Sequence, residues 1–219
     1  MYISALENNT PRIQAPYPPI HYALDSDPEV LTEIYNPDVN LCILKRSIEP
    51  SIKTYSHYLE QTRSSLRIAQ LTSIDKLLDD LVASLPEHPF RNHFIEDVQE
   101  IAEMFCCLFE LKRIGFRLCV LDKTMCPRFH TDKVPCRLIT TYTGPGTEWL
   151  DWQVSDLSSL NSCDAHIPTS SSIHALDEGD IALFKGDQWD KGKQPGVIHR
   201  SPAVQAGKNR LLLTIDFAL

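Results

Sequence analysis

The chain has 219 residues, 42% of them hydrophobic, which is enough to bury a core of ordinary size in a single domain spanning residues 1–219. Its formal net charge of -8 argues against a surface built for nucleic acid or for an anionic membrane. No segment approaches the roughly 18 uninterrupted apolar residues of a membrane-spanning helix, and residues 1–14 lack the apolar centre of a signal peptide. We therefore expect a cytoplasmic protein without membrane contact, whose cysteines are mostly free thiols. Nothing in the sequence indicates an oligomeric state.

The first half, residues 1–115, is predicted to form a proline-rich strap followed by mainly helical support. Its first 28 residues contain five prolines, a density that disfavours both helix interiors and central strands. Asp27-Pro28 predicts the start of a short helix, because an acidic N-cap and a proline in the first turn both favour one. The apolar run Leu41–Leu44 predicts a buried strand, and Glu49–Thr62 predicts a helix that begins at a proline.

Two longer helices are predicted from apolar residues that recur every three or four positions. The first spans Leu71–Leu85 and stops before a proline, and the second spans Asn92–Ile114 and stops at Gly115. The aromatic and cysteine side chains on the second helix are typical of core packing rather than of a cofactor site. Both helices are therefore expected to support the remainder of the fold.

The second half, residues 116–219, changes to short runs rich in β-branched residues that are separated by turns. Polar, serine-rich Leu157–Ser172 shows no periodicity and predicts a loop. Helices followed by many short strands indicate an α+β protein with a β-sandwich or barrel as its C-terminal part. The strands are predicted at Phe116–Leu121, Cys136–Thr143, Ile181–Phe184, Gly196–Arg200 and Asn209–Phe217.

A candidate metal site lies in the segment Arg128-Phe129-His130-Thr131-Asp132. If residues 128–134 are extended, His130 and Asp132 point to the same side, because side chains two apart in a strand share a face. A second imidazole, from His199 on another strand, would complete three ligands and leave the opposite positions open. Two histidines and one carboxylate in this arrangement are typical of a non-haem iron(II) site.

These residues belong to an ordered series that resembles the iron(II)- and 2-oxoglutarate-dependent dioxygenases, a superfamily that includes the prolyl hydroxylases. The resemblance covers residues 128–217 and implies a double-stranded β-helix, the jelly-roll or cupin-like core. It rests on the His-x-Asp motif at His130 and on Gly144–Trp149, Glu178–Phe184, His199–Val204 and Gly207–Phe217. The whole chain is also similar to an uncharacterised bacterial family of this length, sometimes associated with zinc homeostasis, which supplies no substrate.

The resemblance implies a role for each matching residue. His130, Asp132 and His199 would bind iron(II), and Arg210 would bind the distal carboxylate of the cosubstrate 2-oxoglutarate, which a planar guanidinium can hold with two parallel hydrogen bonds. Many members carry a serine or threonine two residues after this arginine, where this chain has leucine, and Thr214 is a candidate substitute. Two residues of the neighbouring strand, Arg137 and Tyr142, are further candidates for contact with cosubstrate or substrate, although sheet packing explains the tyrosine equally well.

Two cysteines bracket the motif and leave a second interpretation open. Cys126 and Cys136 form the pattern Cys-x3-His-x-Asp-x3-Cys, and thiolates favour zinc over oxygen-activating iron. The first hypothesis is therefore an oxygenase that hydroxylates or demethylates a small molecule or a protein side chain. The alternative is a cupin-like protein that binds zinc or iron, or serves metal homeostasis, without oxygenase turnover. The acidic composition disfavours nucleic acid as a substrate.

Overall fold

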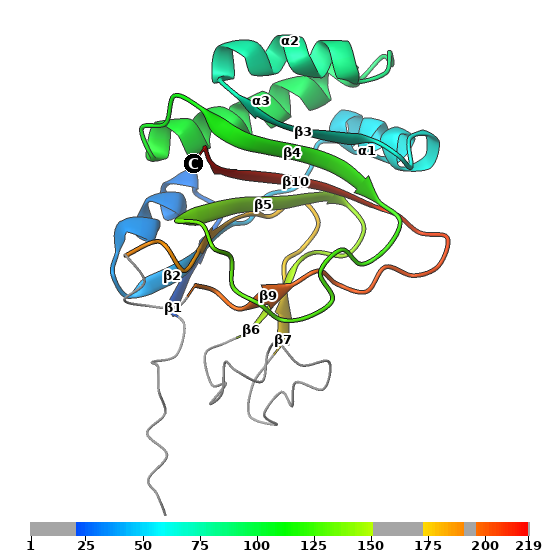
Figure 1. The fold of residues 1–219 in the computed structure, drawn as a ribbon. Helices are drawn as coiled ribbons and strands as arrows, with labels where there is room; N and C mark the ends of the chain where they lie inside the picture. Colours follow the sequence, from blue (N-terminus) through cyan, green and yellow to red (C-terminus); the bar gives the residue numbers. More distant parts are fainter. Residues whose placement is uncertain (1–20, 151–172, 191–195, 219) are drawn as a thin grey trace, which may run out of the picture.

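The computed structural model describes residues 21–150, 173–190 and 196–218, and these residues fold around a large sheet (Figure 1). Most of the proline-rich strap and the predicted loop Leu157–Ser172 lie outside the described residues. None of the helices within those three ranges combines the length and the apolar composition needed to cross a membrane.

The large sheet has seven strands in the order β1-β2-β8-β5-β10-β4-β3, and all neighbours except the parallel pair β1/β2 run antiparallel. A smaller sheet has the order β7-β6-β9. The strands are β1 (His21–Asp25), β2 (Val39–Leu44), β3 (Arg67–Thr72), β4 (Ile114–Leu121), β5 (Cys136–Thr143), β6 (Glu148–Leu150), β7 (Ile173–Ala175), β8 (Ile181–Lys185), β9 (His199–Arg200) and β10 (Arg210–Phe217).

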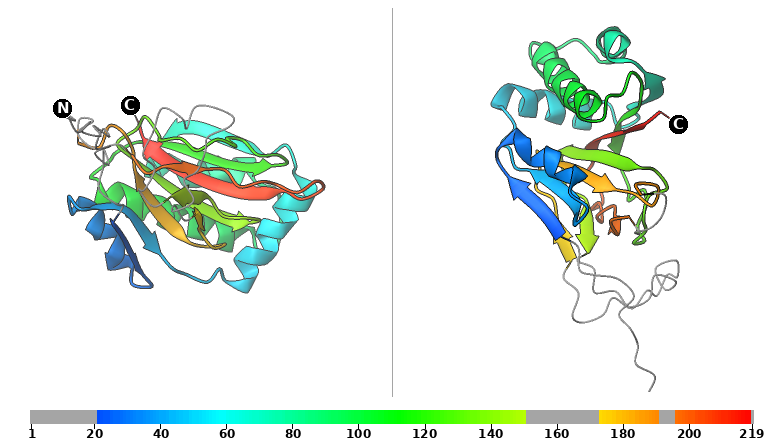
Figure 2. Two further views of the ribbon diagram at one scale, coloured as in Figure 1. Left: turned by 90° about the horizontal axis from the view of Figure 1, so that it is seen from below. Right: turned by 90° about the vertical axis from the view of Figure 1, so that its left-hand side faces the viewer.

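The helices α1 (Pro50–Thr62), α2 (Ile74–Ser84) and α3 (Arg91–Leu108) cover one side of the large sheet, and the smaller sheet lies on the other (Figures 1 and 2). A short 3-10 helix, η1 (Pro28–Tyr35), packs beside β1 and β2. Its N-cap is Asp27, whose carboxylate accepts from the Glu29 backbone, as the sequence predicted. The predicted jelly-roll therefore consists of two sheets, one of them backed by helices.

The expectation of a mainly helical first half is not confirmed. Strands β1, β2 and β3 all come from residues 1–115, and they form both edges of the large sheet. Strand β3 was missed because its Leu71 fits the helical spacing of the following segment, whereas α2 begins only after Ser73. The β sandwich is therefore built from both halves of the chain.

The longest helix also ends earlier than its pattern predicts. Helix α3 stops at Leu108 rather than near Gly115, and Glu110 takes a positive φ of 52°. The Leu111 N–H donates to the Cys106 carbonyl at 2.9 Å and the Glu110 N–H donates to the Cys107 carbonyl, which is a Schellman motif. The sequence did not predict this helix end, because the residue with positive φ is a glutamate and not the glycine that usually marks such a position. The early end of α3 allows β4 to begin at Ile114.

Alternation along the central strands divides their side chains between two cores. On β10, Leu211, Leu213 and Ile215 join the large cluster that packs against the helices, whereas Leu212 joins the cluster between the two sheets. This division is the one that alternation along the predicted strand Asn209–Phe217 requires. The second cluster forms the walls around the candidate site and comprises Leu41, Ile43, Phe129, Ile139, Trp149, Leu150, Leu176, Ala182, Phe184, Val197, Ile198 and Leu212.

Candidate active site

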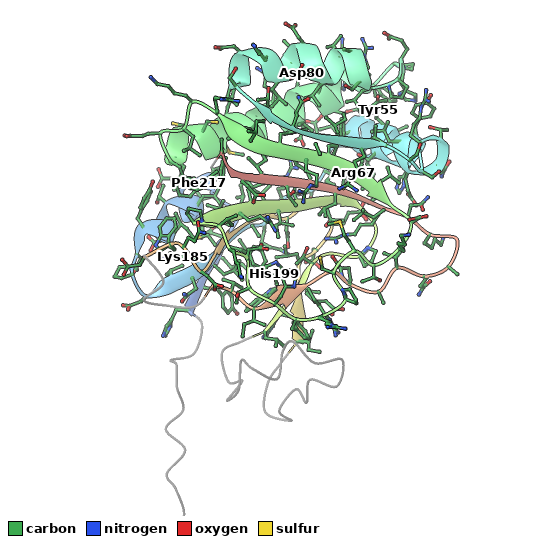
Figure 3. All side chains as sticks on the ribbon, in the orientation of Figure 1. Tyr55, Arg67, Asp80, Lys185, His199 and Phe217 are labelled. Atoms are coloured by element: carbon green, nitrogen blue, oxygen red, sulfur yellow. The ribbon has the colours of Figure 1, made fainter. Side chains whose placement is uncertain are left out.

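The two predicted histidine ligands are brought together by a backbone bridge. The His130 N–H donates to the His199 carbonyl at 3.0 Å, and the His199 N–H donates to the His130 carbonyl at 2.9 Å. Their rings lie 4.6 Å apart, centroid to centroid. Figure 3 shows His199 on the side of the large sheet opposite the helices. The pairing of two segments 69 positions apart thus places both imidazoles at one point, as the sequence hypothesis requires.

Asp132 reaches the same point by a route that the sequence did not predict. Only His130 of the segment 128–134 pairs as a strand, so alternation along a regular strand does not place the carboxylate. Instead, the Asp132 carbonyl accepts from the Asp187 N–H at 2.8 Å. Gly186 permits this contact, because a Cβ there would lie 2.8 Å from the Asp132 carbonyl oxygen and 2.1 Å from that of Val134. The loop after β8 therefore holds the third candidate ligand.

The donor atoms of these three residues fit a divalent cation. One ligand atom from each of His130, Asp132 and His199 lies within 4.8 Å of the others. Each imidazole Nδ1 lies 2.9 Å from a backbone carbonyl, of Arg128 and Val197 respectively, so Nδ1 carries the proton and Nε2 keeps its lone pair. The His199 Nε2 lies 3.2 Å from Asp132 Oδ2, a buried oxygen without a hydrogen-bond donor. The lone pairs of His199 Nε2 and Asp132 Oδ2 therefore face each other without a proton between them, and a metal ion bound by both atoms would satisfy them.

The charges around the cluster keep its ligands in the form that binds metal. Burial and the neighbouring His199 lower the pKa of His130, which favours the neutral imidazole. Burial acts to raise the pKa of Asp132, but the positive charge of the Arg137 guanidinium acts in the opposite direction, and this pKa is lowered to about 2. Arg137 Nη1 lies 2.7 Å from Asp132 Oδ1. The carboxylate is therefore ionised and oriented before any metal arrives.

Arg210 lies in the same pocket and has no acidic partner among the described residues. Its side chain is 1% exposed, and Nη2 donates to the hydroxyls of Thr141 at 2.9 Å and Thr147 at 2.7 Å. The Arg210 Nε has no hydrogen-bond partner within the described ranges, and burial lowers the pKa of Arg210 to about 10. A buried guanidinium without a counter-ion is costly to keep, so the pocket is suited to an anionic ligand. The pocket is lined by Arg117, Met125, Cys126, His130, Arg137, Ile139, Thr147, His199, Arg200, Ser201, Arg210, Leu212 and Thr214.

Comparison with known proteins gives a family and a fold. A family model described as a protein of unknown function, DUF1826, matches residues 25–216. The chain belongs to the DUF1826 family. A search of curated proteins found no match.

Solved structures similar to this DUF1826 chain include two plant dioxygenases. The rice dioxygenase for auxin oxidation has a TM-score of 0.51 at 14% sequence identity, covering 90% of this chain and 82% of that one. The Arabidopsis thaliana dioxygenase for auxin oxidation 1, in a binary complex with 2-oxoglutarate, has a TM-score of 0.55 at 12% identity, covering 90% of this chain and 92% of that one. At such low identity the likeness shows that the DUF1826 chain shares their jelly-roll fold.

Two further residues of the DUF1826 chain that the sequence suggested also lie in the pocket. Thr214 is 6% exposed, and its hydroxyl has no hydrogen-bond partner among the described residues. Arg137 is fully engaged by acids, since it holds both oxygens of Asp216, at 2.6 and 2.9 Å, besides Asp132. Thr214 is therefore available to a ligand, whereas Arg137 holds the Asp132 carboxylate in place, and its suggested contact with cosubstrate stays a prediction.

The suggestion that Tyr142 contacts cosubstrate or substrate is wrong. Tyr142 lies on the helix-facing side of β5, fully buried, and its hydroxyl donates to Asp97 Oδ2 at 2.6 Å. Asp97 also forms an ion pair with Arg46. A strand turns alternate residues to opposite sides, so Thr141 faces the pocket while Tyr142 faces α3.

Replacing this tyrosine by phenylalanine tests the correction. Tyr142→Phe should lower the free energy of unfolding by about 1–3 kcal/mol, because a buried oxygen of Asp97 loses a donor. The affinity of the pocket for a carboxylate probe such as 2-oxoglutarate should not change, because the hydroxyl lies outside the pocket. Urea unfolding and ligand titration measure the two effects. A large loss of 2-oxoglutarate affinity at unchanged stability would contradict the placement of Tyr142.

The proposed four-ligand zinc pattern is not formed. Cys136 is completely buried in the helix-facing cluster beside Cys42, and burial raises the pKa of its thiol well above the usual value. Cys126 lines the pocket, but it does not join the cluster of metal-ligand atoms among the described residues. One cysteine therefore points away from His130 and Asp132, and the two thiols cannot serve a common ion with them.

The sequence also missed the two threonines that hold Arg210. Thr147 follows Gly146, whose position excludes any side chain, because a Cβ would lie 1.9 Å from the Leu176 carbonyl oxygen. The sequence indicated the glycine-rich turn but not its purpose. The close packing of Gly146 against Leu176 places the next residue, Thr147, within hydrogen-bond distance of Arg210. Thr141 gives no separate signal, since threonine is common in strands for reasons of backbone conformation alone.

Valine at either threonine should weaken the binding of a carboxylate ligand at Arg210, for which 2-oxoglutarate is the probe. Thr141→Val and Thr147→Val each remove one hydrogen bond to Arg210 while keeping the side-chain shape, so we expect about a 3- to 10-fold loss of affinity with metal binding unchanged. Thr140→Val is the matched control, because the Thr140 hydroxyl has no partner among the described residues and does not line the pocket. Equal effects of all three substitutions, measured by calorimetric titration, would argue against the assigned contacts.

Proposed function

We propose that this protein is an iron(II)- and 2-oxoglutarate-dependent oxygenase that hydroxylates or demethylates an organic substrate. The observation that carries the proposal is a single pocket lined by His130 and His199 of the candidate metal cluster and by the buried Arg210, which has no acidic partner among the described residues. One half of that arrangement suits a divalent cation and the other suits a carboxylate. A molecule with a 2-oxo acid at one end and a second carboxylate at the other end matches both.

The three ligands have separate tasks. His130 and His199 would bind iron(II) through Nε2, since each Nδ1 proton is donated to a backbone carbonyl. Asp132 would supply the carboxylate and is oriented by Arg137. Two imidazoles and one carboxylate leave positions for the 2-oxo acid and for dioxygen. Bound iron(II) supplies the dioxygen activation that couples decarboxylation of 2-oxoglutarate to oxidation of the substrate.

Arg210 would fix the other end of the cosubstrate. Its guanidinium can hold a carboxylate with two parallel hydrogen bonds, and Thr141 and Thr147 keep the fork in place. Burial makes this charge interaction stronger than it would be in water. The apolar walls at Leu212 and Ile139 limit access of water to the same space.

The similar plant structures support the proposal at the level of fold. The Arabidopsis protein is described as a dioxygenase in complex with 2-oxoglutarate, and this chain covers 92% of its length. The present chain combines that fold with a metal-type cluster and an arginine suited to a carboxylate. We therefore propose the same cosubstrate here, whereas the oxidised substrate is not carried over from the plant enzymes.

Anaerobic reconstitution of the full chain tests the proposal. Iron(II)-loaded protein should bind 2-oxoglutarate with a weak visible charge-transfer absorption band, and air should then convert the 2-oxoglutarate to succinate and carbon dioxide. Loaded protein that binds no 2-oxoglutarate would contradict the cosubstrate assignment. Tight zinc binding without either signal would instead favour a cupin-like metal-binding protein that lacks oxygenase turnover.

A further inference from the structure

The pocket contains more arginine than the cosubstrate needs. Four arginines line it, in a chain whose net charge is -8. Arg137 is bound by Asp132 and Asp216, and Arg200 lies 2.6 Å from Glu148. Arg210 is assigned to 2-oxoglutarate. The fourth arginine is Arg117 on β4, for which no acidic partner is found among the described residues.

Arg117 has an unsatisfied polar atom directed into the protein. Its Nε is buried and has no hydrogen-bond partner in the described part of the chain. The acid nearest to Arg117 in the strand register is Asp216 on β10. It pairs with Gly115, which lies two residues before Arg117 on β4. Both oxygens of Asp216 are already held by Arg137 at 2.6 and 2.9 Å. Arg117 is therefore not neutralised by the carboxylate that the sheet places closest to it.

A second unsatisfied group lies directly beside Arg117. Thr214 is its cross-strand partner on β10, and side chains of directly opposed residues have Cβ atoms about 5 Å apart. The Thr214 hydroxyl is buried and lacks a partner, like the Arg117 Nε, and both residues line the same pocket. A guanidinium and a hydroxyl side by side form a donor pair suited to one oxyanion.

This donor pair is separate from the cosubstrate anchor. Arg117 and Thr214 share one row across the sheet, and Arg210 lies four residues farther along β10. Four residues of a strand span about 13 Å, so the two arginines rise from well-separated points of the sheet. Arg210 is also held by its own two threonine hydroxyls. In the proposed function the metal cluster and Arg210 take the two ends of 2-oxoglutarate, so the donor pair is a further place for negative charge in the pocket.

We propose that Arg117 and Thr214 bind an oxyanion, a carboxylate or a phosphate, on the substrate that is oxidised. The inference rests on the proposed oxygenase function and adds the chemical class of the substrate, a small organic anion. Its apolar part packs against Leu212, which shares a face of β10 with Thr214, and against Met125, which also lines the pocket. Arg117 is then a substrate-binding and specificity-determining residue, and it makes no contact with the cosubstrate.

Calorimetric titration of the anaerobic, iron(II)-loaded protein, saturated with 2-oxoglutarate, tests the proposal with three probes. These are phenylacetate, phenyl phosphate and the neutral analogue phenylacetamide. At least one anion should bind about 10-fold or more tightly than the amide, because charge-assisted hydrogen bonds are stronger than neutral ones. Preference for phenylacetate indicates a carboxylate substrate, and preference for phenyl phosphate indicates a phosphorylated one.

Variants identify the residues responsible. Arg117→Gln should abolish the preference for the anion and leave the affinity for 2-oxoglutarate unchanged, and Thr214→Val should reduce the preference several-fold. Arg67→Gln is the matched control, because Arg67 is an exposed arginine on the neighbouring strand β3 and does not line the pocket (Figure 3). It should behave as the wild type.

Each outcome separates this inference from the oxygenase function. No preference for either anion in the wild type would overturn the oxyanion site, and so would an equal loss of 2-oxoglutarate and probe affinity in Arg117→Gln. Anion binding that depends on Arg117, in a protein that does not bind 2-oxoglutarate, would support the oxyanion site and contradict the oxygenase function.

Discussion

Replacing His199 by alanine should abolish iron(II) binding and with it the formation of succinate from 2-oxoglutarate. His199 is 5% exposed, and its free Nε2 faces the ionised carboxylate of Asp132 at 3.2 Å. Loss of an outer partner of a metal ligand already costs about 10- to 100-fold in metal affinity, so loss of the ligand itself should cost more than about 100-fold. Metal content after gel filtration and competition with a chelator measure the change.

The control for this substitution is another histidine of the chain. His57 lies half-buried on α1 near Glu60, far from the candidate ligands in the chain, so His57→Ala should retain metal. Circular dichroism and urea unfolding show whether each variant remains folded. Full metal retention in a folded His199→Ala protein would refute the assignment of His130, Asp132 and His199 as the metal site.

Replacing Arg210 by glutamine should weaken 2-oxoglutarate binding by at least about 30-fold while iron(II) binding persists. Truncating one partner of a buried charged pair costs about 2–5 kcal/mol, and each 1.4 kcal/mol is about tenfold in affinity. Arg210 meets this condition because it is 1% exposed and has no acidic partner among the described residues. Calorimetry measures the affinity directly.

A stability measurement gives an independent check on Arg210. Because 2-oxoglutarate binds only the folded state, it should raise the melting temperature of the iron(II)-loaded wild type and of Arg67→Gln, but not of Arg210→Gln. Unchanged 2-oxoglutarate affinity in the Arg210→Gln protein would mean that the carboxylate lies elsewhere in the pocket. Arg117, which lines the same pocket and has no acidic partner among the described residues, would then be the first residue to examine.

The sequence predicted the elements whose signals are local. The span of β5 agrees with the structure at both ends, and the alternation of β10 correctly separated Arg210 and Thr214 from the leucines that face the helices. The end of α3 was misplaced because Glu110 adopts a left-handed backbone conformation that residue type does not announce. Local patterns therefore predict faces better than they predict where an element stops.

The candidate site shows the same division. His130, Asp132 and His199 were found from their residue types and order, and the structure brings them together. The role suggested for Tyr142 is wrong because Tyr142 and Thr141 lie on opposite faces of β5, and Thr141 is the one that faces the pocket. The sequence does not specify which of the two faces points into the pocket. The zinc pattern failed for the same reason, since Cys136 points toward the helices.

By itself, the sequence determined the chemistry available to this protein: two imidazoles, a carboxylate and an arginine in a fixed order along short strands. Only the tertiary structure decided which polar groups remain without a partner. Arg117 and Thr214 are 97 positions apart, and each is unremarkable alone. The sheet places them side by side, and Arg137 binds both oxygens of the nearby Asp216. The polar atoms of Arg117 and Thr214 therefore lack this acid as a hydrogen-bond partner. Partners are set by contacts between distant strands, which residue order does not specify.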